Sequence, residues 1–237
     1  MDERPAPPDT EPLTPARRSR STIVVFLALV AVLLAADLAI KTVAFARVGD
    51  RPVILMPDWG AFEDYLREPT AADPPPLVVV VNDLESDREL SGQRHRVAIP
   101  GLLHFKLTTN TGAVFGLGAG KRWVFIIVSV FATVVVGYLF LFSPAKARWQ
   151  HLGLALILAG ALGNLYDRVR FAAVRDMFHM LPGWELPFGL TWPGGVAEVW
   201  PWVFNLADVL LLAGVGLILA LTWLNPEAKP QSSTKAN

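Results

Sequence analysis

Long hydrophobic stretches alternate with polar segments along the chain. Apolar runs cover 22–46, 122–142, 150–167 and 202–224. A helix that spans a bilayer needs about 20 predominantly apolar residues, so each run predicts one transmembrane helix, although the apolar part of 150–167 is short for this purpose. The first run is too long for the apolar region of a cleaved signal peptide and is expected to be an anchor. The pattern predicts a membrane all-α core, a four-transmembrane-helix bundle.

The polar segments between these runs predict the rest of the architecture. Residues 1–21 are rich in Pro, Glu and Arg and predict a disordered cytoplasmic tail, and 225–237 predict a second cytoplasmic tail. Residues 47–121 contain Pro-rich breaks and two β-like runs, Leu77–Val81 and His104–Thr109. We therefore expect a small extracytoplasmic β-rich region with an insertion here. Residues 168–201 form an extracytoplasmic link.

Basic residues set the expected orientation. Arg17 and Arg18 precede the first run, Lys146 and Arg148 join the second to the third, and Lys229 follows the fourth. The positive-inside rule therefore places both termini in the cytoplasm. Three arginines on the opposite side do not fit this rule and need another explanation. They are Arg168, Arg170 and Arg175.

The composition and the absence of several motifs limit the kinds of reactive group that the protein can use. The chain is 53% hydrophobic, and its 21 basic and 21 acidic residues cancel, so no nucleic-acid partner is indicated. Without cysteine there is no disulfide, thiolate zinc site or cysteine nucleophile. The four histidines have no metal-ligand spacing, and the glycine-rich stretch ending at Lys121 is followed by Arg122 instead of Ser or Thr. We expect no metal and no cofactor, which leaves carboxylates as the reactive groups.

Four polar residues are predicted to meet at the outer end of the bundle: Asp37, Asn164, Asn205 and Asp208. A helix starting at Trp202 would place Asp208 about 9 Å along the helix, just below the outer interface. Asn205, three residues earlier on the same face, can orient that carboxylate. Asp37 and Lys41 are four residues apart and predict a structural ion pair. A carboxylate in an apolar helix is either used in chemistry or serves as a polar clamp between helices.

A second aspartate, Asp176, follows the third run. In that run Ala159 and Gly163 have the small-xxx-small spacing that permits close helix packing. Asp176 alone would be an ordinary loop acid. Together with Asp208 it suggests a membrane-embedded acid/base pair, because two carboxylates that share a proton cannot both ionise.

Several ordered segments resemble the lipoprotein signal peptidase family, the type II signal peptidases. The segments are NTGAVFG from Asn110, GALGNLYDRV from Gly160, VRDMF from Val174 and FNLADV from Phe204. DLAIK, from Asp37, is similar to a fifth family block but has Leu38 and Ile40 at its polar positions. Ala172 and Met177 stand where the family usually has Gly and Phe, and the segments 48–96 and 180–201 are longer than is typical.

This resemblance implies an aspartic endopeptidase of the bacterial inner membrane that cleaves signal peptides from diacylglyceryl-modified preprolipoproteins. By the resemblance Asp176 and Asp208 are catalytic, and the active site lies at the outer leaflet among membrane lipids in a monomeric protein. It also implies substrate-binding positions at Asn110, Gly112, Asn164, Arg168 and Asn205.

Two other functions remain open from the residues. A catalytically inactive membrane scaffold would use the polar residues only to join helices. A proton-coupled transporter would use the acids as a proton path, but the acids gather in one leaflet and no internal repeat is present.

Overall fold

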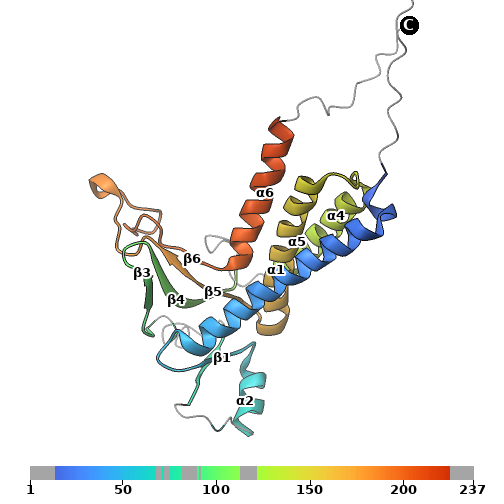
Figure 1. The fold of residues 1–237 in the computed structure, drawn as a ribbon. Coiled ribbons are helices and arrows are strands. Elements are labelled where there is room, and N and C mark those ends of the chain that lie inside the picture. The colour runs from blue at the N-terminus through green and yellow to red at the C-terminus, as the bar shows by residue number, and fades with distance from the viewer. Residues whose placement is uncertain are drawn as a thin grey trace, which may run out of the picture.

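The computed structural model describes residues 14–67, 71, 75–81, 90, 92–112 and 122–224. Predictions on 1–13, 113–121 and 225–237, including most of the NTGAVFG segment, lie outside the described residues. Within the described ranges, four helices are long and apolar enough to cross a membrane. They are α1 (Arg20–Arg47), α4 (Arg122–Phe142), α5 (Arg148–Phe171) and α6 (Leu206–Leu224). Figure 1 shows them gathered into one bundle, with the strands and a short helix at one end.

Three predicted boundaries differ from the structure. The tail predicted through residue 21 is ordered from Thr14, because a short helix, η1 (Ala16–Arg18), packs on the bundle and Ser19 caps α1 by accepting from the Thr22 amide. The third helix is 24 residues long, about 36 Å, and extends two residues before and four residues after the predicted span. The fourth span begins at Leu206 instead of 202, because the residues just before it extend into a strand.

Helix α5 is the buried centre of the bundle and contacts α1, α4 and α6. Its glycines allow this packing. A Cβ at Gly160 would collide with the Ala207 carbonyl of α6, and one at Gly163 would collide with the Asp37 carboxylate of α1. These glycines therefore bring the first turn of α6 and the Asp37 carboxylate of α1 close to the polar end of α5.

A four-stranded antiparallel sheet covers that end of the bundle. Its order is β3 (Arg96–Ile99), β4 (Leu103–Asn110), β5 (Val174–Met180) and β6 (Val203–Phe204). The run His104–Thr109 correctly predicted β4. The interpretation of Asp176 as a loop acid was wrong, since it lies on β5 opposite Thr108 of β4.

The remaining part of the predicted β-rich region is a small parallel unit. β1 (Val53–Met56) pairs with β2 (Leu77–Val80), and α2 (Trp59–Arg67) follows β1. The run Leu77–Val81 predicted β2. The unit packs through Leu55, Leu77 and Val79 into one core cluster with Phe45 of α1 and Met177 of β5. β5, the strand that carries Asp176, is therefore held by its neighbouring strands and by this core cluster.

Candidate active site

The first turn of α6 fixes Asp208 through a reciprocal cap. Asn205 is the residue before the helix, and its side-chain Oδ1 accepts from the Asp208 amide at 3.1 Å. The Asp208 carboxylate in turn accepts from the Asn205 amide at 3.2 Å. This is the capping-box arrangement, built from Asn and Asp. Asp208 therefore lies in the first turn, where the helix dipole favours a negative charge, and not 9 Å along the helix as the sequence suggested.

Asp176 faces α6 from the sheet. The Asn205 Nδ2 donates to Asp176 Oδ1, so one amide side chain contacts both aspartates. The sequence predicted that this side chain orients Asp208, and it does bond to the Asp208 amide; its bond to Asp176 was not predicted. The side chain of Asn110, at the end of β4, also hydrogen-bonds the Asp176 carboxyl.

Asp176 is the more deeply buried of the two acids. The residue is 1% exposed. Desolvation, and then the nearby charge of Asp208, raise the pKa of the Asp176 carboxyl to about 8, while the bond from Asn205 acts in the opposite direction. Burial therefore favours the neutral form of the Asp176 carboxyl.

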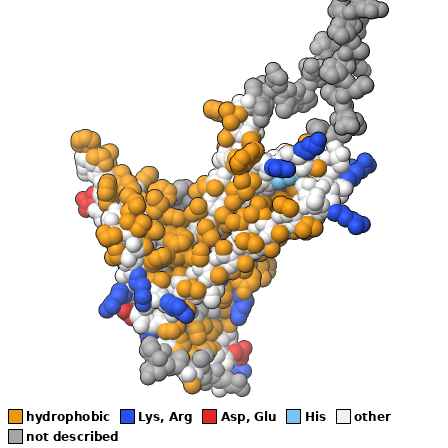
Figure 2. Space-filling view, viewed as in Figure 1, with side chains coloured by type: hydrophobic (Ala, Val, Ile, Leu, Met, Phe, Trp, Pro, Cys, Tyr) orange, Lys and Arg blue, Asp and Glu red, His pale blue; other side chains and the backbone are white. Residues whose placement is uncertain are grey.

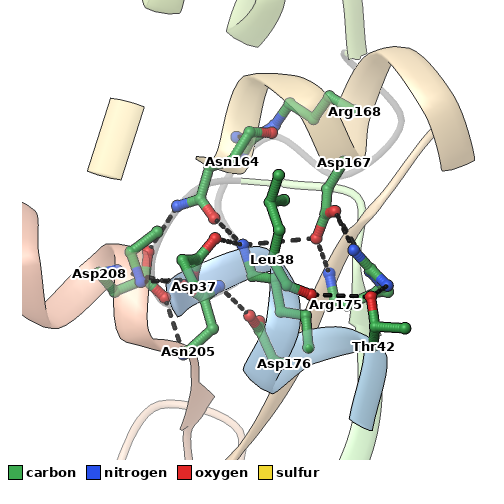
Figure 3. A network of polar contacts seen from close by, with 12 residues as sticks. Asp37, Leu38, Thr42, Asn164, Asp167, Arg168, Arg175, Asp176, Asn205 and Asp208 are labelled. Carbon is green, nitrogen blue, oxygen red and sulfur yellow. Dashed lines mark hydrogen bonds and ion pairs between the residues drawn. The ribbon is translucent and has the colours of Figure 1, made fainter. Parts of the chain in front are cut away.

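A chain of polar contacts joins this pair to α1 and α5 (Figure 3). Asn164 of α5 donates from Nδ2 to Asp208 Oδ1 at 2.8 Å and accepts at Oδ1 from the Lys41 ammonium at 3.0 Å. Lys41 and Asp37 form the predicted ion pair at 2.8 Å, and both are fully buried. The other oxygen of Asp37 accepts from the Ala207 amide of α6 at 2.9 Å. Asp37 thus caps α6 from a neighbouring helix.

Of two further members of this network, Asp167 was not singled out from the sequence, and Arg175 was noted only as an arginine that does not fit the charge rule. Asp167 of α5 is fully buried, lies 3.4 Å from the Lys41 ammonium, and accepts from both the backbone and the guanidinium of Arg175 at 2.8–3.2 Å. Arg175 immediately precedes Asp176. Its pairing with Asp167 fixes β5 to α5, and it gives Arg175 a local reason to be at this end of the bundle. The only sequence signal was the Asp of the GNLYDRV segment.

Arg168, predicted to bind substrate, holds a loop in the structure. Its Nη2 donates to the Gly112 carbonyl at 2.8 Å, and its guanidinium lies 5.1 Å from the Phe125 ring of α4. Within the described residues its Nε has no hydrogen-bond partner although the atom is buried. Gly112 donates to Asn110 Oδ1 at 3.0 Å, so Arg168 supports the turn that presents Asn110.

A cavity of about 710 Å³ opens between the sheet and α6. Asp208 and Asn110 contribute to its lining, whereas Asp176 lies beneath the surface. The rest of the lining is almost entirely apolar, with Trp200, Trp202 and Phe204 on the sheet side and Leu211 on α6. The arrangement offers an apolar groove with one aspartate in its wall and a second aspartate buried beneath it, which suits acid/base chemistry on an extended apolar ligand.

Comparisons with known proteins agree with this picture. The family described as Signal peptidase (SPase) II matches residues 77–224. The Lipoprotein signal peptidase of Latilactobacillus sakei is 39% identical over 124 residues, which cover 52% of this chain and 71% of that protein. That of Photorhabdus laumondii is 31% identical over 161 residues, covering 65% of this chain and 87% of that protein. The Lipoprotein signal peptidase of Rhodopirellula baltica is 36% identical but is covered over only 54% of its length.

Solved structures share the fold at lower identity. A bacterial membrane enzyme determined at 2.3 Å superposes with a TM-score of 0.56 at 20% identity, covering 90% of this chain and 96% of the other. A second, determined at 1.9 Å, gives a TM-score of 0.51 at 21% identity, with 84% and 92% covered.

Proposed function

The chain belongs to the signal peptidase II family, and from this membership we propose that it is a membrane aspartic endopeptidase that removes signal peptides from lipid-modified preprolipoproteins. The observation that carries the aspartic mechanism is Asn205, whose side chain contacts Asp176 and the amide of Asp208. A single side chain thereby links the two acids: Asp208, which lines the groove, and Asp176, which is buried beneath its surface.

The two acids are proposed to share one proton, with Asp176 as the acid and Asp208 as the base. Burial supports the proton on Asp176, whose pKa is about 8. Asp208 accepts from the Asn164 side chain and the Asn205 amide in the first turn of α6, which favours its carboxylate form.

The proposed reaction needs no covalent intermediate. Asp208 takes a proton from a water, whose oxygen attacks the scissile carbonyl carbon while Asp176 gives its proton to the carbonyl oxygen. The resulting tetrahedral diol collapses as Asp208 passes its proton to the leaving nitrogen and the C–N bond breaks. One diol hydroxyl returns its proton to Asp176, which restores the starting pair.

Asn110 is proposed to bind substrate directly because it lines the groove. Gly112 and Arg168 support it, and Asn164 and Asn205 orient the acids. Asp37 and Lys41 are proposed as structural, since both are fully buried and join α1 to α5 and α6. The apolar groove would receive the hydrophobic part of the signal peptide in a monomer embedded in membrane lipids.

The test is cleavage of a diacylglyceryl-modified preprolipoprotein by the purified protein and by Asp176→Asn and Asp208→Asn variants. Each single variant should lose cleavage, and the double variant should be scarcely worse, because residues that act as a unit are not additive. A chelator should leave the rate unchanged. Substantial cleavage by Asp208→Asn would overturn the dyad, and a folded wild-type protein that binds substrate without cutting it would indicate a scaffold.

A further inference from the structure

The segment between β5 and β6 folds into a hairpin that stands out from the sheet (Figure 1). We call residues 181–202 the β5–β6 hairpin. Its two arms are joined by backbone hydrogen bonds from Leu186 to Ala197 and from Val199 to Trp184, each 2.7 Å long. Nearer its end, Trp192 donates to the Val196 carbonyl at 2.8 Å. The hairpin is thus an ordered unit, and its tip is the segment from Leu186 to Ala197.

The tip is apolar and faces away from the protein. The sequence LPFGLTWPGGVA contains no charged residue, and the nearest charges are Glu185 and Glu198, which face each other at its base. Phe188 is 98% exposed and Leu190 is 59% exposed. An aromatic side chain left entirely outside the core forgoes the favourable free energy that burial would provide, so this surface suits a non-aqueous environment.

The backbone at the tip directs the phenyl ring outward. Phe188 has φ +61° within the short helix η3 (Pro187–Gly189). A bulky residue in the left-handed region is uncommon and costs free energy. The segment adopts this conformation where the ring makes no contact with the core, so the core does not explain it.

The position of the hairpin identifies its surroundings. In Figure 1 the hairpin and α6 rise from the same side of the sheet, and α6 is a membrane-spanning helix that starts directly after β6. Figure 2 shows hydrophobic side chains over both on this face. Trp202, at the base, lies against Trp192 of the tip and against Trp200, with ring centroids 4.8 and 5.5 Å away. Tryptophans concentrate at the membrane interface.

We propose that the tip of the β5–β6 hairpin inserts into the lipid leaflet beside α6, so that Phe188 and Leu190 reach the boundary between headgroups and acyl chains. An interfacial element of this kind enters to about 5–10 Å. The internal backbone bonds of the hairpin make this possible, because lipid offers no partners to free amides. Glu185 and Glu198 then lie at the level of the headgroups.

Insertion would give the sheet a second attachment to the membrane. The hairpin leaves β5 four residues after Asp176 and returns through β6 to Asn205. The tip and the two acids therefore belong to one continuous segment of chain, which also lines most of the groove. Contact of the tip with lipid would fix the position of the sheet along α6.

Site-directed spin labelling in proteoliposomes tests the proposal without any substrate, so its failure leaves the peptidase proposal untouched. The chain has no cysteine, so single variants can be labelled directly. The probes are Phe188→Cys and Leu190→Cys. Arg94→Cys, with a side chain 78% exposed in the loop before β3, is the aqueous reference. Phe131→Cys, 68% exposed at the middle of α4, is the lipid reference.

Collisions with oxygen, which partitions into lipid, are compared with collisions with a water-soluble nickel chelate. Both tip labels should favour oxygen as the Phe131 label does, whereas the Arg94 label should favour nickel. A tip label with the nickel accessibility of Arg94 would overturn the proposal. If both reagents are excluded and spin–spin broadening between copies disappears on lipid dilution, the tip is covered by a second copy and the proposal is wrong.

Discussion

Asn205 makes two separable contributions at the residue scale. Its Oδ1 caps α6, and its Nδ2 donates to Asp176. Asn205→Ser retains a capping oxygen and removes the amide donor, whereas Asn205→Ala removes both. Because a hydrogen bond to a charged or shared-proton group contributes about 1.5–3 kcal/mol, both variants should lose roughly 10- to 100-fold in kcat.

Melting temperature distinguishes the two contributions. The Ala variant should melt below wild type and the Ser variant close to it. If Asn205→Ser recovered the rate as well as the stability, Asn205 would be only a helix cap, and its contact with Asp176 would not matter for catalysis.

Asp176 predicts a pH dependence with a definite sign. Its folded-state pKa of about 8 lies above the ordinary value of 3.8. The contribution of this carboxyl to the free energy of unfolding is therefore fully present below pH 3.8, the ordinary pKa, and is lost as pH rises through about 8. The rate should fall over the same upper range as the acid loses its proton, giving the alkaline limb of a bell-shaped profile that belongs to the pair.

Thermal melting from about pH 6 to pH 9 isolates this effect. Wild type should lose stability relative to Asp176→Asn as pH increases, because Asn has no proton to lose. Parallel melting curves for the two proteins would contradict the assignment of the proton to Asp176.

Some residues of the candidate site could be identified from the sequence, and others could not. Asp176 and Asp208 stood out because few reactive groups remained once cysteine and metal motifs were absent. Asp167 and Arg175 did not, because the turn after α5 that brings them together is visible only in three dimensions. Likewise, the Asn205 side chain reaches Asp176 only because β5 lies beside the start of α6. Residue spacing along one helix cannot show that arrangement.

At the scale of elements, the contact between α5 and α6 sets the position of the base. A Cβ at Gly160 would meet the Ala207 carbonyl and the Leu211 side chain, next to Asp208. Gly160→Ala should therefore cost about 1–3 kcal/mol through overpacking and should lower activity by displacing the first turn of α6. Thermal melting in detergent and the cleavage rate measure both effects.

Gly137→Ala is the matched control. It lies within α4, and a Cβ there meets nothing within 4 Å. Because Ala forms helix more readily than Gly by about 1 kcal/mol, this variant should be as stable as wild type or more so. Equal behaviour of the two variants would show that the close approach of α5 and α6 is not required.

Helices and strands were not equally predictable. The spans could be recognised because lipid demands long apolar runs, and α4 has the bounds that hydropathy suggested. β5 could not, because VRDMFHM is buried but carries two charges that are satisfied by α5 and α6. β6 has only two residues, too few for any periodicity, and its omission placed the start of α6 four residues too early.

On the scale of the whole molecule, the two ends of the bundle differ in how their basic residues are used. Ala16 donates to the Ser143 carbonyl and Ala145 donates to Thr14, both at 2.8 Å, so the N-terminal segment meets the α4–α5 link at one end. Exposed basic residues gather there (Figure 2), namely Arg17, Arg18, Arg20, Lys146 and Arg148. At the sheet end, Arg168 and Arg175 are instead buried in bonds to the Gly112 carbonyl and to Asp167.

This difference accounts for two of the three arginines that opposed the predicted orientation, Arg168 and Arg175, whereas Arg170 is exposed and still counts against it. Only exposed basic residues near the ends of spans are free to interact with the cytoplasmic side, so the positive-inside rule should count the first group and discount the two buried arginines. We therefore predict that both termini are cytoplasmic and that the sheet, the groove and both acids lie on the outer side. Single-cysteine variants in sealed right-side-out vesicles measure this. An impermeant maleimide should label Arg94→Cys at once and Lys146→Cys only after permeabilisation. The reverse order would place the acids at the cytoplasmic face, where a substrate already translocated across the membrane could not reach them.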